Sequence, residues 1–336
     1  MRNSSPVIIV GSLLVYALLA PGQDWNHDWK LKRSRRDDQV HFTVERSKIG
    51  NQWSHSSDVP LDRFRGLSME TLERGGAAKF EYVHDAGRLL CQGRFSLGRG
   101  SGTYTFAPNP QFVSELQRLG YETPNEDQLL SMVMSDVGLE FARGVKDAGL
   151  EASTKQLIEL RIHGVTLDYI HYARAAGYTG FSAKNFVEMR IHGVESDFLR
   201  DLKTQGYDLP ARDIVELRIH GVTSELMADL RRAGYDLTSK QITELRIHGV
   251  TPEYLRELKG FGLQPSASDL VELRIHGVSP EFIRETKELG YTFTTKELTE
   301  LKIHGVNGAY LKRLRDSGMR NLTAAQIAKL RIHGVY

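Results

Sequence analysis

The sequence predicts a mainly α-helical protein: an α-solenoid of about eight two-helix repeats of about 28 residues, preceded by a small antiparallel β domain. Two observations predict this fold. A motif ending in His-Gly-Val recurs seven times from residue 159 onward at a nearly constant spacing. Ahead of it, residues 40–107 alternate apolar and polar side chains in short runs separated by glycine-rich turns. The predicted organisation is a signal peptide (1–22), a charged linker (23–39), the β domain (40–107) and the repeat domain (108–336).

The chain begins with an apolar run from Val7 to Ala20, preceded by one positive charge at Arg2. The run is shorter than the roughly 20 residues that span a bilayer, and Ala20 and Gly22 are small enough for a cleavage site. We therefore expect a periplasmic or extracellular protein without stable membrane insertion after signal cleavage. An uncleaved anchor is the alternative.

The composition is that of a folded protein with balanced charge. Lys and Arg number 44 and Asp and Glu number 42, so the net charge of +2 gives no reason to expect a nucleic-acid partner. Basic residues gather locally between Lys30 and Arg36, inside the polar, aperiodic stretch 23–39. We interpret this stretch as a solvated linker, with a patch for an anionic polymer or lipid headgroups as the alternative.

Residues 40–107 contain four runs with strand character, divided by turns at 85–87 and 98–102. The glycines at 98–102 do not form a dinucleotide loop, because that loop opens a helix and these lie between two strand-like runs. A hairpin is expected instead. Cys91 is the only cysteine, so no internal disulfide can form and the thiol is expected to be buried.

From Asn109 onward the chain repeats. The glycine of the motif stands at 164, 193, 221, 249, 277, 305 and 334, and a degenerate copy precedes these with Met132, Asp136 and Val137 in place of Leu, Gly and Val. Eight helix pairs fit between 109 and 336.

Local sequence explains why each repeat is a helix pair. Thr238 and Gln241 form a capping box that begins one helix, and Gly249 ends it with a left-handed residue. Thr251 then caps the next helix, with Pro252 in its first position.

One repeat cannot fold alone. Ordering 28 residues costs roughly 40 kcal/mol of conformational entropy, more than two short helices offset by burying their apolar faces. The repeats must therefore stack in a row. Because the last repeat shows no polar cap before Tyr336, we also consider a partner or a second copy of the chain there.

A column of cations runs down the array. Arg161 falls within the apolar arc that Leu157, Leu160 and Ile162 define at about 100° per residue, and a half-buried cation needs a partner. The expected partners are the acids that begin the following helices: Asp168, Asp197, Glu225, Glu253 and Glu281. At the sixth position Lys302 replaces Arg and Ala309 replaces the acid, which favours a structural ladder over anion binding. The ladder consists of Arg161, Arg190, Arg218, Arg246, Arg274 and Arg331.

A second column pairs Glu and His, four residues apart on the opposite, polar side of the same helices. Its members are Glu159 and His163, Glu188 and His192, Glu216 and His220, Glu244 and His248, Glu272 and His276, and Glu300 and His304. Histidine at a helix C-terminus is commonly a dipole partner, and binding is the alternative. No metal is expected, because helix axes about 8 to 10 Å apart keep neighbouring histidines from sharing an ion.

Aromatic residues form a third column, on the first helices and after their closing glycines. Tyr169 and Tyr254 are examples of the first kind and Tyr178 of the second. We expect inter-helix core, with outward hydroxyls for peptide or glycan recognition as the alternative.

No catalytic motif is present, so we expect neither an enzyme nor a cofactor. The one remaining catalytic hypothesis places Arg94, His84 and Ser101 near glycine turns of the β domain.

The pattern Leu-Arg-Ile-His-Gly-Val-Thr-Pro-Glu-Tyr at 245–254 resembles the helical repeat tails that follow the peptidase domain in some bacterial beta-lactam-sensor-type membrane metallopeptidases, and those of related uncharacterised exported proteins. The resemblance covers residues 109–336. This sequence lacks the peptidase part and its zinc motif, so the resemblance implies a bacterial source and a sensing or protein-binding accessory role, and no activity.

Together these features predict an exported module that binds a protein or peptide through the extended repeat surface. The alternative is a self-assembling scaffold of the cell envelope, in which the partner is the protein itself.

Overall fold

The computed structural model describes residues 25–36, 38–48 and 51–335. The predicted signal peptide, residues 1–22, lies outside this described part. Among the described residues no helix combines the length and apolar character needed to cross a membrane. The chain divides into two compact units, one formed by residues up to 114 with 124–138 and the other by 115–123 with 139–336.

The first unit contains a seven-stranded antiparallel half-barrel sheet in the order β3-β2-β1-β7-β6-β5-β4, which confirms the predicted β domain. Its strands are β1 (Asn26–Arg33), β2 (Gln39–Lys48), β3 (Asn51–Pro60), β4 (Phe64–Arg65), β5 (Gly76–His84), β6 (Gly87–Ser96) and β7 (Arg99–Pro108). A single helical turn, η1 (Leu61–Arg63), and a short helix, α1 (Met69–Arg74), join β3, β4 and β5.

The prediction that residues 23–39 form a linker was wrong for most of this stretch. Residues 26–33 are β1, an interior strand that pairs with both β2 and β7. Trp29 and Leu31 are buried, and Lys30 and Lys32, which alternate with them, are exposed. The short alternation Trp-Lys-Leu-Lys is therefore a strand signal that the surrounding charges obscured.

Aromatic rings fill the core of the sheet. The rings of Trp29 and Phe80 pack edge to face with their centroids 4.8 Å apart, and those of Phe42 and Phe64 pack in the same way at 5.3 Å.

Gly93 of β6 and Gly102 of β7 stand opposite each other, and a Cβ atom at either position would collide with the backbone of the other strand. Glycine at both positions lets the two strands approach closely.

Helix α3 (Glu126–Met134) belongs to the first unit, so the predicted domain boundary at residue 108 is not where the compact units divide. It packs against β6 and β7. After it, Asp136 takes the place of the motif glycine with a left-handed φ of 58°, and Val137 N–H donates to the carbonyl of Met132 at 2.9 Å. This confirms the degenerate repeat, since aspartate tolerates this backbone conformation.

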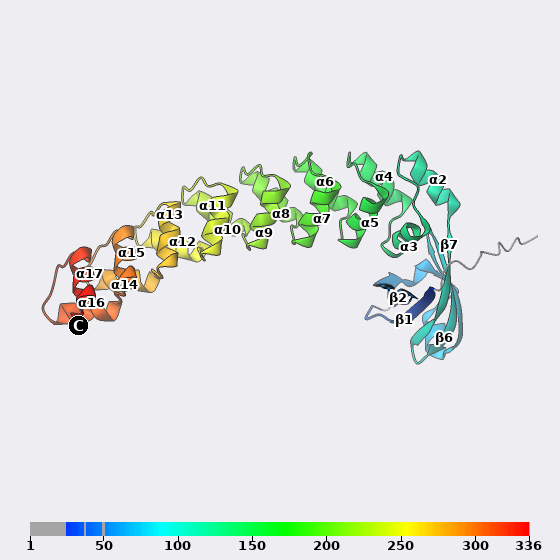
Figure 1. Cartoon of the computed structure of the whole chain (residues 1–336), viewed down its shortest axis with the longest axis horizontal. Helices are drawn as coiled ribbons and strands as arrows, with labels where there is room; N and C mark the ends of the chain where they lie inside the picture. The colour runs from blue at the N-terminus through cyan, green and yellow to red at the C-terminus, as the bar shows by residue number, and fades with distance from the viewer. Residues whose placement is uncertain (1–24, 37, 49–50, 336) are drawn as a thin grey trace, which may run out of the picture. The chain divides into compact units, whose positions relative to one another are not determined.

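The array consists of nine-residue helices that alternate between the two positions of each repeat, and together α2 to α17 make the eight predicted pairs within the described residues (Figure 1). First-position helices are α2 (Pro110–Arg118), α4 (Leu139–Asp147), α6 (Leu167–Ala175), α8 (Ser196–Thr204), α10 (Ser224–Arg232), α12 (Pro252–Gly260), α14 (Pro280–Glu288) and α16 (Gly308–Asp316). Second-position helices after α3 are α5 (Thr154–Ile162), α7 (Ala183–Ile191), α9 (Ala211–Ile219), α11 (Ser239–Ile247), α13 (Ala267–Ile275), α15 (Thr295–Ile303) and α17 (Ala324–Ile332).

Each helix of the second unit packs against the helix two places further along. From α5 to α17 the odd-numbered helices form one layer, and from α4 to α16 the even-numbered helices form the other. This stacking confirms the predicted solenoid.

The predicted caps are present. Thr238 and Gln241 form the capping box of α11, and Thr251 accepts a hydrogen bond from the N–H of Tyr254 at the start of α12, where Pro252 is the first residue. Helix ends are thus fixed by residues within a few positions of the end itself.

Candidate interaction surface of the repeat array

The His-Gly-Val motif closes each second-position helix in the same way. At the end of α5, Gly164 N–H donates to the carbonyl of Arg161 at 3.0 Å and Val165 N–H donates to that of Leu160 at 2.8 Å. This is a Schellman motif, with Gly164 at a φ of 71° and Val165 fully buried. The glycine and the valine therefore have structural reasons to recur.

The isoleucine of the motif has no such reason. In all seven repeats its side chain is 55–60% exposed, although an exposed helix position does not favour a β-branched apolar residue. The set, which we call the isoleucine column, consists of Ile162, Ile191, Ile219, Ile247, Ile275, Ile303 and Ile332.

This exposure corrects the predicted apolar arc. The buried side of α5 is formed by Leu157, Ile158 and Leu160, with Arg161 half-buried among them. Ile162 lies about 140° around the helix from Leu157, which is beyond the buried side. The prediction that Ile162 belongs to the apolar arc was therefore wrong, because the buried side ends at Ile158.

The predicted Glu and His column lies on the same exposed side as the isoleucines. Glu159 precedes Ile162 by three residues and His163 follows it directly, and both side chains are half-exposed or exposed, as they are in the next five repeats. In these described repeats no hydrogen bond or ion pair joins the Glu side chain to the His four residues later. The imidazoles and carboxylates therefore face solvent beside the isoleucines.

The isoleucine and histidine positions are more uniform than a matching position on the other layer. The position four residues after the start of each first-position helix is exposed or half-exposed and is occupied by His171, Arg200, Ala228, Arg256, Arg284 and Lys312. On the second-position helices, Ile and His are the same in seven repeats and Glu is the same in six, with Lys329 in the last. Packing within the described residues does not account for an exposed isoleucine in all seven repeats.

The cation ladder packs against the preceding helix. Apart from Arg246, each cation lies over the aromatic ring at the third residue of the first-position helix before it, as Arg274 does over Tyr254 at 4.8 Å and Lys302 over Phe282 at 5.0 Å. The other pairs are Arg161 with Phe141, Arg190 with Tyr169, Arg218 with Phe198 and Arg331 with Tyr310, at 5.0 to 5.2 Å. The equivalent position before Arg246 is Leu226, and Arg246 donates to the carbonyl of Gly221 at 3.0 Å.

The predicted partners of this ladder, the acids that begin the following helices, are wrong for the described contacts of Arg190 to Arg274. Arg190 pairs with Glu195 at 2.7 Å, two residues before the expected Asp197. Two of the expected acids bind arginines of their own helices, Asp197 to Arg200 at 2.8 Å and Glu253 to Arg256 at 2.7 Å. An arginine three residues away on the same helix is nearer than a side chain that points toward another repeat.

The tyrosines also serve packing. Hydroxyl groups of Tyr169 and Tyr254 donate to the carbonyls of Val194 and Val278, in the turns that end the following helices, at 2.7 and 3.0 Å. Outward hydroxyls for glycan or peptide recognition are therefore not found at these positions.

Other candidate sites are not assembled in the described residues. No group of three or more potential metal ligands lies together there. His84 is buried, with its Nε2 3.3 Å from a carboxylate oxygen of Asp136. Arg94 and Ser101 lie on the opposite, outer face of the sheet, so the three residues of the catalytic hypothesis are not brought together.

No family model matches the chain, and a comparison with curated proteins finds no match either. The fold and the surface define the class: a repeat protein of the α-solenoid type with an additional β-sheet unit.

Proposed function

We propose that the protein is an exported interaction module that binds a protein or peptide through the isoleucine column and the Glu and His side chains beside it. The observation that carries this proposal is the exposure of the same isoleucine in seven repeats. Contiguous exposed apolar surface rimmed by polar side chains marks sites of interaction with proteins or membranes.

The charges on this surface favour a polypeptide over a polyanion. Six of its repeats carry Glu three residues before the isoleucine. Lys or Arg stands seven residues before it in five repeats, and Lys155 pairs with Glu159 at 3.6 Å. Side chains of both positive and negative charge therefore surround an apolar centre, as in the interfaces between proteins.

Export rests on the apolar N-terminal run, and the resemblance of the motif to the repeat tails of beta-lactam-sensor-type proteins supports an accessory role in a bacterial envelope. The alternative function, a self-assembling scaffold, uses the same surface with a second copy of the chain as the partner.

Site-directed photo-crosslinking in the native cells tests the proposal. A photoreactive residue at Ile219 or Ile275 should give one discrete crosslinked species, whereas the same residue at Arg284 or Lys312, on the other layer, should give none. A species of twice the chain mass would establish the scaffold. Equal labelling from both layers, or none from either, would refute a binding role for this surface.

Two purified double variants provide the second test, through recovery of the partner and helical content. Replacing Glu216 and His220 by Ala, or Ile219 and Ile247 by Lys, should abolish recovery of the crosslinked partner and leave the helical content unchanged, since these side chains are solvent-exposed or half-exposed. A partner still recovered in full by both variants would mean that binding occurs elsewhere.

A further inference from the structure

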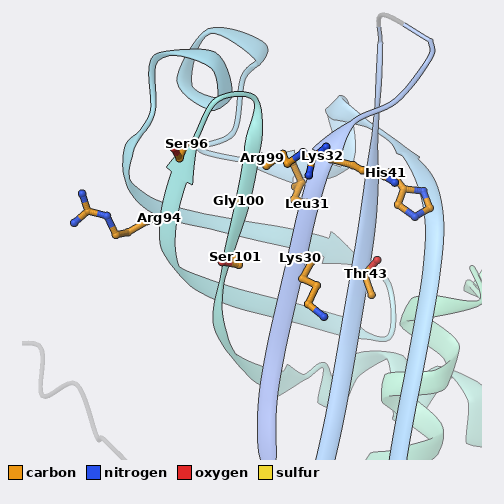
Figure 2. A pocket seen from close by; sticks show the side chains of 10 residues that line it. All are labelled: Lys30, Leu31, Lys32, His41, Thr43, Arg94, Ser96, Arg99, Gly100 and Ser101. Atoms are coloured by element: carbon orange, nitrogen blue, oxygen red, sulfur yellow. The ribbon is translucent and has the colours of Figure 1, made fainter.

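The outer face of the sheet carries a depression of about 650 Å³ that neither the repeat array nor the proposed function uses (Figure 2). Its polar lining comes from β1, β2, β6 and β7, and includes Lys30, Lys32, Arg94, Arg99 and Ser101. The volume is in the range of sites for small ligands, about 300 to 1,000 Å³.

Strand register brings like charges together at this depression. Lys32 of β1 stands directly opposite Arg99 of β7, and like charges at directly opposite positions destabilise a sheet. Neither side chain has an acid or hydrogen-bond partner among the described residues, and the same holds for Arg94. An arrangement that costs stability and has no internal compensation points to a ligand that supplies the negative charge.

Hydroxyl groups alternate with these cations. Ser101 faces Lys30 on one side and Arg94 on the other, and Ser96 faces Arg99. Cations bind oxyanions, and serine hydroxyls can donate to or accept from the hydroxyls of a sugar. The lining therefore offers two kinds of polar group at neighbouring positions.

The edges of the depression are neutralised internally. Lys30 pairs with Glu45 at 2.8 Å, and His41 Nδ1 lies 3.0 Å from Asp58 Oδ1. The unpartnered charge is thereby confined to Lys32, Arg94 and Arg99. A confined group of cations suits a compact anion rather than a long polyanionic strand.

The lining also argues against nucleic acid. No Phe, Tyr or Trp is among the described residues that line the depression, and the imidazole of His41 at its edge is bound to Asp58, so bases would find no series of rings on which to stack. We propose that this face of the sheet binds an anionic saccharide, a sugar unit bearing sulfate, phosphate or carboxylate groups, with Lys32 and Arg99 as its principal contacts. This site lies in the first unit and does not depend on the proposed function of the array.

Calorimetric titration of the full chain with sucrose octasulfate at low salt tests the proposal. The wild type should bind, and the double variant Lys32→Ser with Arg99→Ser should bind more weakly by roughly tenfold or more, because two charge-assisted contacts are lost. The matched control is Arg65→Ser with Lys79→Ser, which removes the same charge from exposed positions on β4 and β5 and should retain wild-type affinity.

Several outcomes would overturn the proposal. These are no binding by the wild type, an equal loss in the control variant, tighter binding of a short single-stranded DNA than of the sulfated sugar, or equal affinity for inorganic sulfate alone. Thermal unfolding of both double variants establishes that each is folded, since all four side chains are exposed.

Discussion

The hydroxyl group of Tyr254 donates a hydrogen bond to the carbonyl oxygen of Val278 at 3.0 Å. It joins a first-position helix to the Schellman turn that ends the following second-position helix. Replacing Tyr254 with Phe leaves that buried carbonyl unpaired and should lower the free energy of unfolding by about 1 kcal/mol. Guanidinium denaturation followed by helical circular dichroism measures the loss.

Tyr207 provides the control for this measurement, because its hydroxyl is buried without a hydrogen-bond partner. Tyr207→Phe should be neutral or slightly stabilising. Equal destabilisation by both substitutions would show that the Val278 contact contributes nothing specific.

Leu226 interrupts the aromatic positions that underlie the cation ladder, and filling the gap should stabilise the array. Leu226→Tyr would place a ring beneath Arg246, at the same sequence separation from Val250 that Tyr254 has from Val278. A cation–π contact and a hydrogen bond together should add about 1 kcal/mol, less any cost of overpacking. Leu226→Phe should give only part of the gain, and a loss with both variants would contradict the proposed geometry.

The motif glycine has two roles: it adopts a left-handed backbone conformation, and it leaves space for an arginine of the cation ladder. Substitutions at Gly249 and Gly277 distinguish these two roles. Both have positive φ, 76° and 69°, so alanine at either position should cost about 1 kcal/mol. A Cβ on Gly249 would also lie 3.0 Å from a guanidinium nitrogen of Arg274, whereas one on Gly277 would meet nothing within 4 Å. Thermal denaturation should therefore show a larger loss for Gly249→Ala, and the reverse order would contradict the ladder contact.

The isoleucine column should be dispensable for folding. Ile247→Lys, at a 57% exposed position, should change the free energy of unfolding by less than about 0.5 kcal/mol. Leu245→Ala, two residues away and buried, should cost about 2 to 5 kcal/mol. Should Ile247→Lys prove as damaging as Leu245→Ala, the isoleucines would be part of the core.

Alkaline pH should unfold the array through its buried tyrosines. Burial raises the pKa of Tyr121, Tyr178 and Tyr254 to about 12, above the ordinary value of about 10. The unfolded chain loses these protons first, so the stability they contribute is fully present below pH about 10 and falls as the pH rises toward 12. Loss of helical circular dichroism should accompany the main rise in phenolate absorbance, and phenolate formation by all tyrosines near pH 10 in a helical protein would contradict this assignment.

Local rules account for what the sequence predicted correctly. Helix starts at Thr238 and Thr251 and the helix end at Gly249 depend on hydrogen bonds within a few residues, so they are readable without a fold. The period of about 28 residues likewise required stacking, because a single pair cannot offset its own loss of entropy.

Contacts between distant residues decided the rest. The strand at 26–33 depends on pairing with β2 and β7, and β7 lies some seventy residues further along the chain. Arg274 meets the ring of Tyr254 in the preceding helix rather than an acid of the following helix, because helix packing brings those two side chains together. The exposure of Ile162 and its counterparts follows from which side of each helix its neighbours cover, and only the packed array determines that side.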